Sequence, residues 1–430
     1  MTTVENSHPE APAPDHSEAT DDHHVQKLLR LGVSVAALIA LSVITGTFAI
    51  AAFVIAVIAI VMLHEFGHFV TAKRAGMKVT EYFLGFGPRL WSVRKGETEY
   101  GVKAIPLGGY VKIIGMSNME KDVDPEDEPR TYRQQSYRAR VTVALAGIFT
   151  HFAIAFLLLM LLWTVVGVPN FDAPSPKIGE ISANSPAEQA GFRVGDKVLS
   201  VDGRPAKTWD SVRPYIRDHP GQELTFVVQR DGASVTLVAK PADVNPRGER
   251  VGYLGVGHQA EVQTTNPLSA AGRSLEQLGE LTVESVKGLA SFFSPSSLES
   301  YGGLLVGDKP VQEANPAPGT SANEKRPVSI VGVGRLAGQA AETGAFEVII
   351  LLVLLNVFIG IFNLVPLLPL DGGHVAIATY EKIRSRNGRR YHADVSKMMP
   401  VTAVVLVVML ALGVTSIYLD IFNPVANPFQ

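Results

Sequence analysis

Long apolar runs constrain the fold of this chain more than any other feature of its sequence. Hydrophobic residues make up 47% of the 430 residues and charged residues only 18%, and the apolar residues are bunched together. A helix needs about 20 apolar residues to span a bilayer, so such runs predict a polytopic α-helical membrane protein. The runs occupy about residues 28–72, 141–168, 347–368 and 400–419.

The first run is too long for one span. At ~1.5 Å per residue, residues 28–63 alone would form a helix ~54 Å long, whereas the hydrocarbon core is ~30 Å thick. Thr45-Gly46-Thr47 is the natural place for a tight turn, which predicts helices over 28–44 and 48–72. One long tilted helix is the alternative, and the sequence leaves it open. The polar and acidic residues 1–27 are predicted to form a disordered tail.

Lysine and arginine residues in the loops predict the orientation of the spans. They are concentrated in residues 73–140 and 381–392, so the positive-inside rule assigns both segments to the cytoplasm. The segment 169–345 between them is then extracytoplasmic. The formal net charge is −3 and no basic block is present, which argues against nucleic-acid binding. Because the chain has no cysteine, a bound metal must be held by His, Asp or Glu.

The predicted span over 48–72 contains the pentapeptide HEFGH. His64 and His68 are four residues apart, so a helix puts them one turn apart on the same face, where both can bind one metal ion. Glu65 is then positioned to take a proton from an attacking water. Ionisable residues are costly inside a span, so three within five positions indicate a functional site. The alternative is a pair of core histidines hydrogen-bonded to a neighbouring helix, with Glu65 neutralised by one of them.

A catalytic zinc ion needs three protein ligands and an open position. Asp371 is the only acid between Glu347 and Glu381, and it lies in the stretch FNLVPLLPLDGGH. Two prolines obstruct a continuous helix here and two glycines free the backbone, which predicts a span over 347–380 with an unwound NxxPxxPLDGG segment. Irregular backbone at membrane depth is tolerated beside protein or a wet cavity, which favours water near Asp371. An acid at the interfacial end of a helix is the alternative.

The segments between the spans contain further predicted elements. Residues 73–140 alternate aromatic and β-branched residues with polar ones, which predicts β-hairpins. Residues 177–241 alternate short strands with two short helices, and the stretch SPAEQAGFRVGDKVLSVDGRP resembles a PDZ domain. Apolar residues at helical spacing predict an amphipathic helix over 268–293. Residues 294–326, rich in Ser, Gly, Pro and Asn, are predicted to be a flexible linker.

Together these motifs resemble the site-2 protease family of intramembrane zinc metalloproteases, and within it the RseP-like branch with a single PDZ domain found in actinobacteria. The resemblance covers about residues 45–420, through HEFGH, GFGP, IPLGGYVKI, the PDZ domain and FNLVPLLPLDGGH. It implies that His64, His68 and Asp371 bind one Zn²⁺ ion and that Glu65 is the general base.

The resemblance also implies roles for residues around the ligands. Asn363 would hydrogen-bond the substrate backbone or the reacting oxygen, or else be a buried amide satisfied by a neighbouring helix. His374 is expected beside the ligands rather than among them. The family has AGPxxN where this chain has AGIFTH, so His151 either replaces the Asn as a hydrogen-bonding group or marks a change without that role. A membrane-entering hairpin whose edge pairs with an unwound substrate would contain Gly85, Phe86 and Gly87.

The function that the resemblance implies is hydrolysis of peptide bonds within the transmembrane helices of single-span proteins. Its substrates would be proteins such as anti-sigma factors already trimmed by an upstream, site-1-type protease. The protein is expected in the lipid bilayer of the cell membrane, with the PDZ domain outside and the active site toward the cytoplasm. A catalytically inactive scaffold that presents a PDZ domain, and a metal transporter that uses the same ligands, are the alternatives.

Overall fold

The computed structural model of the chain describes residue 29 and residues 32–34, 36–116, 123–170, 176–245, 250–259, 261–306, 326–385 and 391–425. The tail predicted over residues 1–27 lies outside the described residues. The chain divides into two compact units. The second unit contains Leu161–Ala270, and the first contains the residues on either side of that segment.

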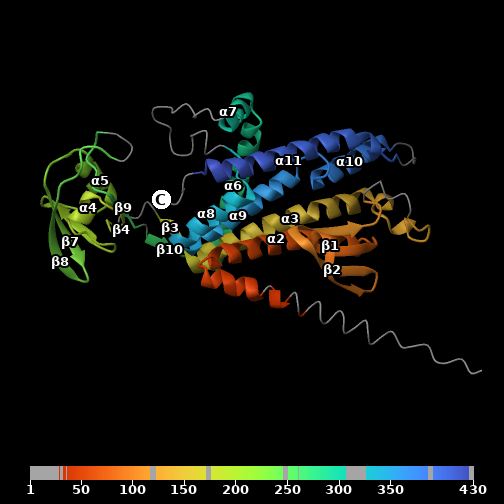
Figure 1. The fold of residues 1–430 in the computed structure, drawn as a ribbon, viewed down its shortest axis with the longest axis horizontal. Helices are drawn as coiled ribbons and strands as arrows, with labels where there is room; N and C mark the ends of the chain where they lie inside the picture. The colour runs from red at the N-terminus through yellow and green to blue at the C-terminus, as the bar shows by residue number, and fades with distance from the viewer. Residues whose placement is uncertain are drawn as a thin grey trace, which may run out of the picture. The chain divides into compact units, whose positions relative to one another are not determined.

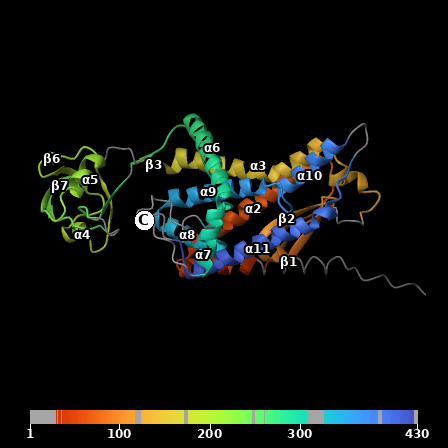
Figure 2. The same ribbon diagram turned by 90° about the horizontal axis from the view of Figure 1, so that it is seen from above.

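Four helices in the described part of the chain are long and apolar enough to cross a membrane. Their apolar residues surround them on all sides, as expected where the outer surface of a helix meets lipid. In both views the long helices of the first unit run side by side (Figures 1 and 2). They are α2 (Phe48–Arg74), α3 (Tyr137–Leu161) with its short π-helical continuation Leu162–Val166, α9 (Ala345–Asn363) and α11 (Met399–Phe422), which follows the 3₁₀ turn Val395–Met398.

A tight turn separates α2 from a shorter apolar helix, Gly32–Ile44, that precedes it. The turn contains Gly46 in the left-handed conformation, at φ +71°. The backbone N–H of Thr47 donates to the carbonyl oxygen of Ser42, a hydrogen bond typical of a helix that ends at a glycine. The first apolar run therefore forms two separate helices, and α2 is the one long enough to cross a membrane.

A bent hairpin of two strands, β1 (Val79–Lys95) and β2 (Thr98–Ile113), follows α2. The first part of β1 pairs with residues 109–113 on one side and with residues 99–102 on the other. Gly85, at φ +83°, lies where β1 bends. The base of the hairpin packs against α2 and α3 through a core that contains Ala72, Met77, Val79, Ile113, Tyr132 and Val143.

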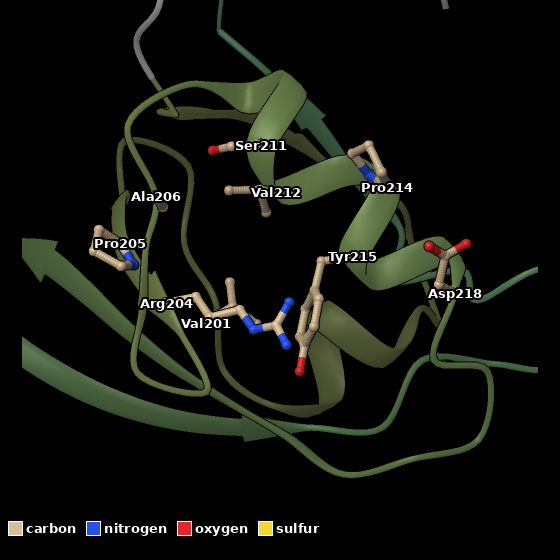
Figure 3. A pocket seen from close by; sticks show the side chains of 9 residues that line it. All are labelled: Val201, Arg204, Pro205, Ala206, Ser211, Val212, Pro214, Tyr215 and Asp218. Atoms are coloured by element: carbon tan, nitrogen blue, oxygen red, sulfur yellow. The ribbon is translucent and has the colours of Figure 1, made fainter.

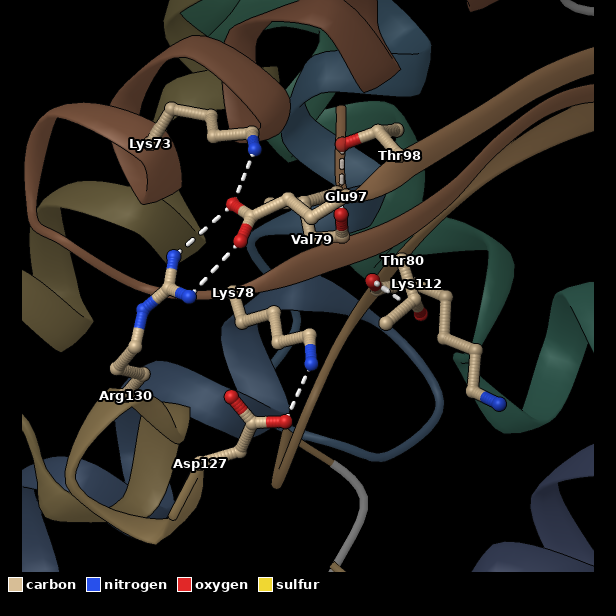
Figure 4. Close-up of polar contacts among 9 residues, drawn as sticks. All are labelled: Lys73, Lys78, Val79, Thr80, Glu97, Thr98, Lys112, Asp127 and Arg130. Atoms are coloured by element: carbon tan, nitrogen blue, oxygen red, sulfur yellow. Dashed lines mark hydrogen bonds and ion pairs between the residues drawn. The ribbon is translucent and has the colours of Figure 1, made fainter. Parts of the chain in front are cut away.

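Ion pairs tie the end of α2 to the hairpin and to the loop that follows it (Figure 4). Glu97, in the turn between the strands, accepts hydrogen bonds from Lys73 and from Arg130. The Arg130 Nη1 and Nη2 atoms lie 2.8 and 3.0 Å from the Glu97 carboxylate oxygens. Lys78 pairs with Asp127 beside them. The loop contains two 3₁₀ helices, Glu128–Arg130 and Tyr132–Gln134.

The apolar stretch after α9 turns and then forms a second helix, α10 (Asp371–Arg384). The break predicted within the span over 347–380 is present, since α9 ends at Asn363 and residues 364–370 are irregular. The predicted bounds differ, because the second helix begins at Asp371 and continues to Arg384. The glycines that were expected to unwind the backbone lie in the first turn of α10. They permit close packing instead, since a Cβ on Gly373 would lie 2.7 Å from the carbonyl carbon of Leu367.

Helices also occupy part of the region predicted to be a linker. α6 (Pro267–Phe292) lies almost where the amphipathic helix is predicted, and it crosses the long helices in Figure 2. α7 (Pro295–Val306) lies inside the predicted linker 294–326, so the prediction is wrong for these residues. The hydroxyl of Ser294 accepts a hydrogen bond from the Ser297 N–H at the start of α7. Tyr301 and Leu304 of α7 pack against Leu419 of α11.

The sequence pattern does not predict α8 (Ile330–Thr343), which contacts α2, α9 and α11. Ser329 caps this helix, because its hydroxyl accepts hydrogen bonds from the N–H groups of Val331 and Gly332. A buried ion pair precedes the cap, with Arg326 Nη2 2.8 Å from a carboxylate oxygen of Asp420 in α11. The ion pair and the cap fix the start of α8 against the end of α11.

The second unit is a small α+β domain built on a four-stranded antiparallel sheet in the order β6-β5-β7-β8. Its core contains Ile178, Val198, Phe226 and Val228. The predicted boundary at 241 is too early, because β9 pairs with β4 at the start of the domain and β10 pairs with β3. The elements are β3 (Val168–Asn170), β4 (Ile178–Ile181), α4 (Pro186–Gln189), β5 (Lys197–Val201), β6 (Arg204–Pro205), α5 (Trp209–Arg217), β7 (Leu224–Arg230), β8 (Ala233–Ala239), β9 (Val256–His258) and β10 (Glu261–Gln263).

A cavity of about 260 Å³ lies within the second unit, between α5 and the strands β5 and β6 (Figure 3). The Arg204 guanidinium lies 4.5 Å from the centre of the Tyr215 ring, and the two side chains form one wall. The Tyr215 hydroxyl donates to a carboxylate oxygen of Asp202 at 3.2 Å. The aromatic ring is thereby held between a cation and an acid at the edge of the cavity.

Candidate metal centre

Three candidate ligands meet in the first unit. His64 and His68 of α2 have their Nε2 atoms 3.2 Å apart. Asp371 Oδ2, from the first residue of α10, lies 3.3 Å from the first and 3.4 Å from the second of these nitrogens. Both histidines are buried and Asp371 is half-buried. The structure therefore brings together residues that are far apart in the sequence.

Local structure explains why these atoms converge. Residues four apart on α2 share one face, so both imidazoles project to the same side. The irregular segment before α10 returns the chain to that depth, and Gly372 lets α10 begin against it, since a Cβ there would lie 2.5 Å from the Val365 carbonyl oxygen. Asp371 is thus presented at the first turn of a helix that starts beside the two histidines.

The three ligand atoms fit a zinc ion. Ligands about 2.0–2.1 Å from a tetrahedral zinc stand roughly 3.3 Å from one another, which matches the observed separations. Asp371 Oδ2 is buried and has no hydrogen-bond partner among the described residues, as expected for an atom that binds a metal. Two imidazole nitrogens and one carboxylate oxygen also leave the fourth position of a catalytic zinc site open.

Glu65 lies one residue after the first ligand and is half-buried. The backbone of Val111, on the last part of β2, lies beside its carboxylate. A Cβ on Gly109 would lie 3.4 Å from Glu65 Cγ, so the strand passes directly beside this side chain. The proposed base therefore faces the hairpin.

The surroundings of the two histidines include residues that the sequence pattern does not single out. The carbonyl oxygen of Val143 in α3 lies 2.7 Å from His68 Nδ1. Gly147 follows one turn later, and any Cβ on it would clash with Cε1 and Nε2 of His64 and with Nε2 of His68. A glycine inside an apolar helix is the one signal in the sequence that marks this close approach.

The other candidate residues lie at different distances from the cluster. The His151 ring is 4.8 Å from the His64 ring, centre to centre. His374, in the first turn of α10, contacts the Tyr132 ring instead, with centroids 6.1 Å apart. Asn363 ends α9, is half-buried, and has no side-chain hydrogen-bond partner among the described residues. The buried amide bonded to a neighbouring helix is Asn356, not Asn363.

Gly85, Phe86 and Gly87 lie at the bend of β1. Both glycines have φ +83°, a left-handed conformation that favours glycine. A Cβ on Gly85 would lie 2.7 Å from the Ile105 carbonyl oxygen of the facing strand. Phe86 is 46% exposed and stacks on the Tyr110 ring. The motif therefore shapes the bend and presents an aromatic side chain.

Comparison with known families matches residues 52–410 to Peptidase family M50. The chain belongs to this family of zinc metallopeptidases. The match includes both histidines and Asp371, and it confirms the resemblance to site-2 proteases inferred from HEFGH and FNLVPLLPLDGGH.

Curated relatives extend over nearly the same residues. The chain is 34% identical over 408 residues to zinc metalloprotease Rip1 of Mycobacterium tuberculosis, covering 87% of this chain and 97% of the relative. Rip1 of Mycolicibacterium smegmatis is 34% identical over 414 residues, with the same coverage. A putative zinc metalloprotease of Rhizobium meliloti is 30% identical over 348 residues, covering 76% of this chain and 85% of the relative.

A solved structure similar to part of the chain is the PDZ domain of an SdrC-like protein from Listeria monocytogenes. It is 17% identical and covers 19% of this chain and 82% of that domain, with a TM-score of 0.17. Membership of the M50 family rests on the family match and the curated relatives, which cover most of the chain.

Proposed function

We propose that this metallopeptidase hydrolyses peptide bonds within the transmembrane helices of single-span proteins, with one zinc ion bound by His64, His68 and Asp371. The observation that carries the proposal is the convergence of two imidazole nitrogens of α2, a helix able to cross a membrane, and a carboxylate oxygen of Asp371 at the start of α10, 3.2 to 3.4 Å apart. Ionisable groups are costly at such a depth and are retained there for function.

Each residue of the site has a distinct role in hydrolysis. The histidines bind as neutral imidazoles and Asp371 adds a negative charge to the ligand set. When bound, zinc supplies the Lewis acidity that polarises a carbonyl group. Glu65 takes a proton from the attacking water as the water oxygen bonds to the carbonyl carbon. As the C–N bond breaks, Glu65 delivers a proton to the leaving amine nitrogen.

The substrate must be unwound before it is cut, because a helix uses its own peptide groups in internal hydrogen bonds. Residues 109–113 pair with β1 on one side only, and their strand passes beside Glu65. An extended substrate segment that adds to the hairpin would reach the base. Asn363 would hydrogen-bond its backbone or the reacting oxygen, since this amide is free of partners in the described structure. The hairpin bend at Gly85, Phe86 and Gly87 would guide the segment.

The proposed membrane orientation follows from charge and depth. Lysine and arginine residues in segments 73–140 and 381–392 favour a cytoplasmic location for both. α2 begins at Phe48, so His64 lies ~24 Å along the helix, in its cytoplasmic half. The second unit would then be an extracytoplasmic PDZ domain that excludes untrimmed substrates. Suitable substrates would be anti-sigma-factor-like proteins first cut by a site-1-type protease.

Cleavage of a tagged single-span protein with a truncated outer segment tests the proposal. We expect Glu65→Gln to keep zinc but lose cleavage by roughly 10²–10⁴-fold, because it lacks a general base. Asp371→Ala should lose both zinc and cleavage. The exposed acid Glu126 provides a matched control, and Glu126→Gln should behave as wild type.

Two outcomes would contradict the proposed function. Cleavage at the wild-type rate in both active-site variants would show that the metal centre is not the catalyst. Wild-type protein that binds no zinc and cuts no substrate would favour the inactive scaffold. A transporter is disfavoured, because the described residues contain one group of three or more possible metal ligands, His64, His68 and Asp371, rather than a series of groups along a path.

A further inference from the structure

His64 and His68 are held in different ways. His68 Nδ1 lies 2.7 Å from the Val143 carbonyl oxygen, a hydrogen bond of the kind that orients a metal-binding imidazole. His64 Nδ1 is buried and has no hydrogen-bond partner among the described residues. The direction of the His64 ring must therefore be set by the groups that pack against it.

α3 supplies those groups on one side of the ring. Gly147 brings the helix backbone against His64, with no room for a side chain. One turn later, the His151 ring centre lies 4.8 Å from the His64 ring centre, and the ring planes are tilted by 43°. His151 is only 1% exposed, so this contact is internal. His151 therefore lies against the His64 ring from the α3 side.

Asn356 of α9 holds His151 in place. Asn356 Nδ2 donates to the Leu352 carbonyl oxygen at 2.8 Å, which leaves Oδ1 as the acceptor. His151 Nδ1 lies 3.0 Å from this Oδ1 and donates to it. Asn356 is fully buried, and a Cβ on Gly360, one turn later, would lie 3.3 Å from His151 Cβ. The Leu352 carbonyl, the Asn356 amide and the His151 imidazole thus form a continuous chain of contacts that ends at His64.

We propose that His151, held by Asn356, is a positioning residue that fixes the His64 imidazole in the direction needed to bind the metal. The inference rests on the proposed function, in which His64 is a ligand. The His151 ring occupies space into which the His64 ring would otherwise turn. The Val143 carbonyl orients His68 directly through a hydrogen bond. Asn356 orients His64 indirectly, because its hydrogen bond fixes the His151 ring that packs against His64.

Zinc competition with a chromophoric chelator, on the purified full-length protein in detergent, tests this role. We expect His151→Ala to weaken zinc binding about 10- to 100-fold, the usual effect of losing a group that orients a ligand. Asn356→Ala should weaken it in the same direction. The double variant should bind no worse than His151→Ala, because Asn356 acts through His151.

Two further measurements separate positioning from a general effect on folding. Cobalt(II) bound in place of zinc has visible absorption bands that report ligand geometry, and these bands should shift in His151→Ala. His151→Phe keeps a ring beside His64 without the hydrogen bond and should recover part of the affinity. Leu159→Ala, fully buried two turns along α3, should lower the melting temperature but leave zinc affinity and the cobalt spectrum unchanged.

The outcomes distinguish this inference from the metal site itself. Zinc binding unchanged in His64→Ala and Asp371→Ala would overturn the proposed ligands. Zinc binding lost in those variants, but wild-type affinity and cobalt spectrum in His151→Ala, would overturn only the role of His151. Independent losses that multiply in the double variant would overturn the claim that Asn356 acts through His151.

Discussion

Arg140, in the first turn of α3, forms a buried ion pair with Glu381 of α10. Arg140 Nη1 lies 2.5 Å from Glu381 Oε2, and the two side chains are 10% and 6% exposed. The other Glu381 oxygen accepts a hydrogen bond from the backbone N–H of Ala393 at 2.7 Å. Because α10 begins with Asp371, this pair ties the helix of the third candidate ligand to the helix that packs on the two histidines.

Breaking this pair from one side should be strongly destabilising. Glu381→Ala leaves the Arg140 guanidinium buried without its partner, which typically costs about 3–5 kcal/mol. We expect a large fall in the thermal unfolding midpoint, together with faster loss of zinc to a chelator as α10 loosens. Both are measured on the detergent-solubilised protein.

The double variant Arg140→Met with Glu381→Met is the matched control for that experiment. Two apolar side chains of similar length remove both charges at once, and such replacements of buried pairs are often neutral. The unfolding midpoint should return most of the way to wild type. A double variant as unstable as Glu381→Ala would show that the lost packing, rather than the unpaired charge, is responsible.

Gly147→Ala should prevent metal binding although alanine favours a helix. The added methyl group would overlap the nitrogens of His64 and His68 that face the metal, so one ring must turn away. We expect zinc content near zero by elemental analysis, with helicity by circular dichroism unchanged. Gly413→Ala in α11, where an added methyl group meets open space, should keep wild-type zinc. Full zinc content in Gly147→Ala would contradict the packing described here.

The sequence was sufficient to pick out the three candidate ligands that the structure brings together, because their pattern is local or isolated. His64 and His68 follow from helical spacing alone, and Asp371 stands out as an acid with apolar neighbours on both sides. The supporting residues could not be found in the same way. Gly147 indicates a close approach but not its partner, and Asn356 is one polar residue in an apolar helix. The roles of both depend on how α3 and α9 are rotated against α2, which no single segment encodes.

The elements that differ from expectation also depend on tertiary contacts. The frequent Ser, Gly and Pro residues around α7 predict a linker. The segment is helical in the structure, where Tyr301 and Leu304 pack against α11. β9 has only three residues, too few for an alternating pattern to predict a strand. They form a strand because they pair with β4. The glycines after Asp371 suggest unwinding locally, whereas close packing on residues 364–368 explains them in the fold.

Removal of the metal should lower stability as well as activity. A ligand that binds only the folded state stabilises it by about 2.7 kcal/mol at 100 times its dissociation constant. A chelator should therefore lower the unfolding midpoint of wild type. His68→Ala should start at a lower midpoint and show no further change with chelator. A chelator effect of equal size in His68→Ala would show that the stabilising metal is bound elsewhere.

Glu97 should make the hairpin sensitive to acid. Hydrogen bonds from Arg130, and with them Lys73, lower the pKa of Glu97 from its ordinary 4.5 to about 2. Because the folded pKa is below the unfolded one, the stabilisation is fully present above about pH 4.5 and is lost as the pH falls toward 2. The difference in unfolding midpoint between wild type and Glu97→Gln, measured from pH 7 downward, should therefore stay constant to about pH 5 and then shrink.

The Glu97 carboxylate is partly exposed, so added salt should reduce this difference in unfolding midpoint at neutral pH. A difference that does not change between pH 5 and 2.5 would mean that the Glu97 charge contributes nothing to the stability of the hairpin.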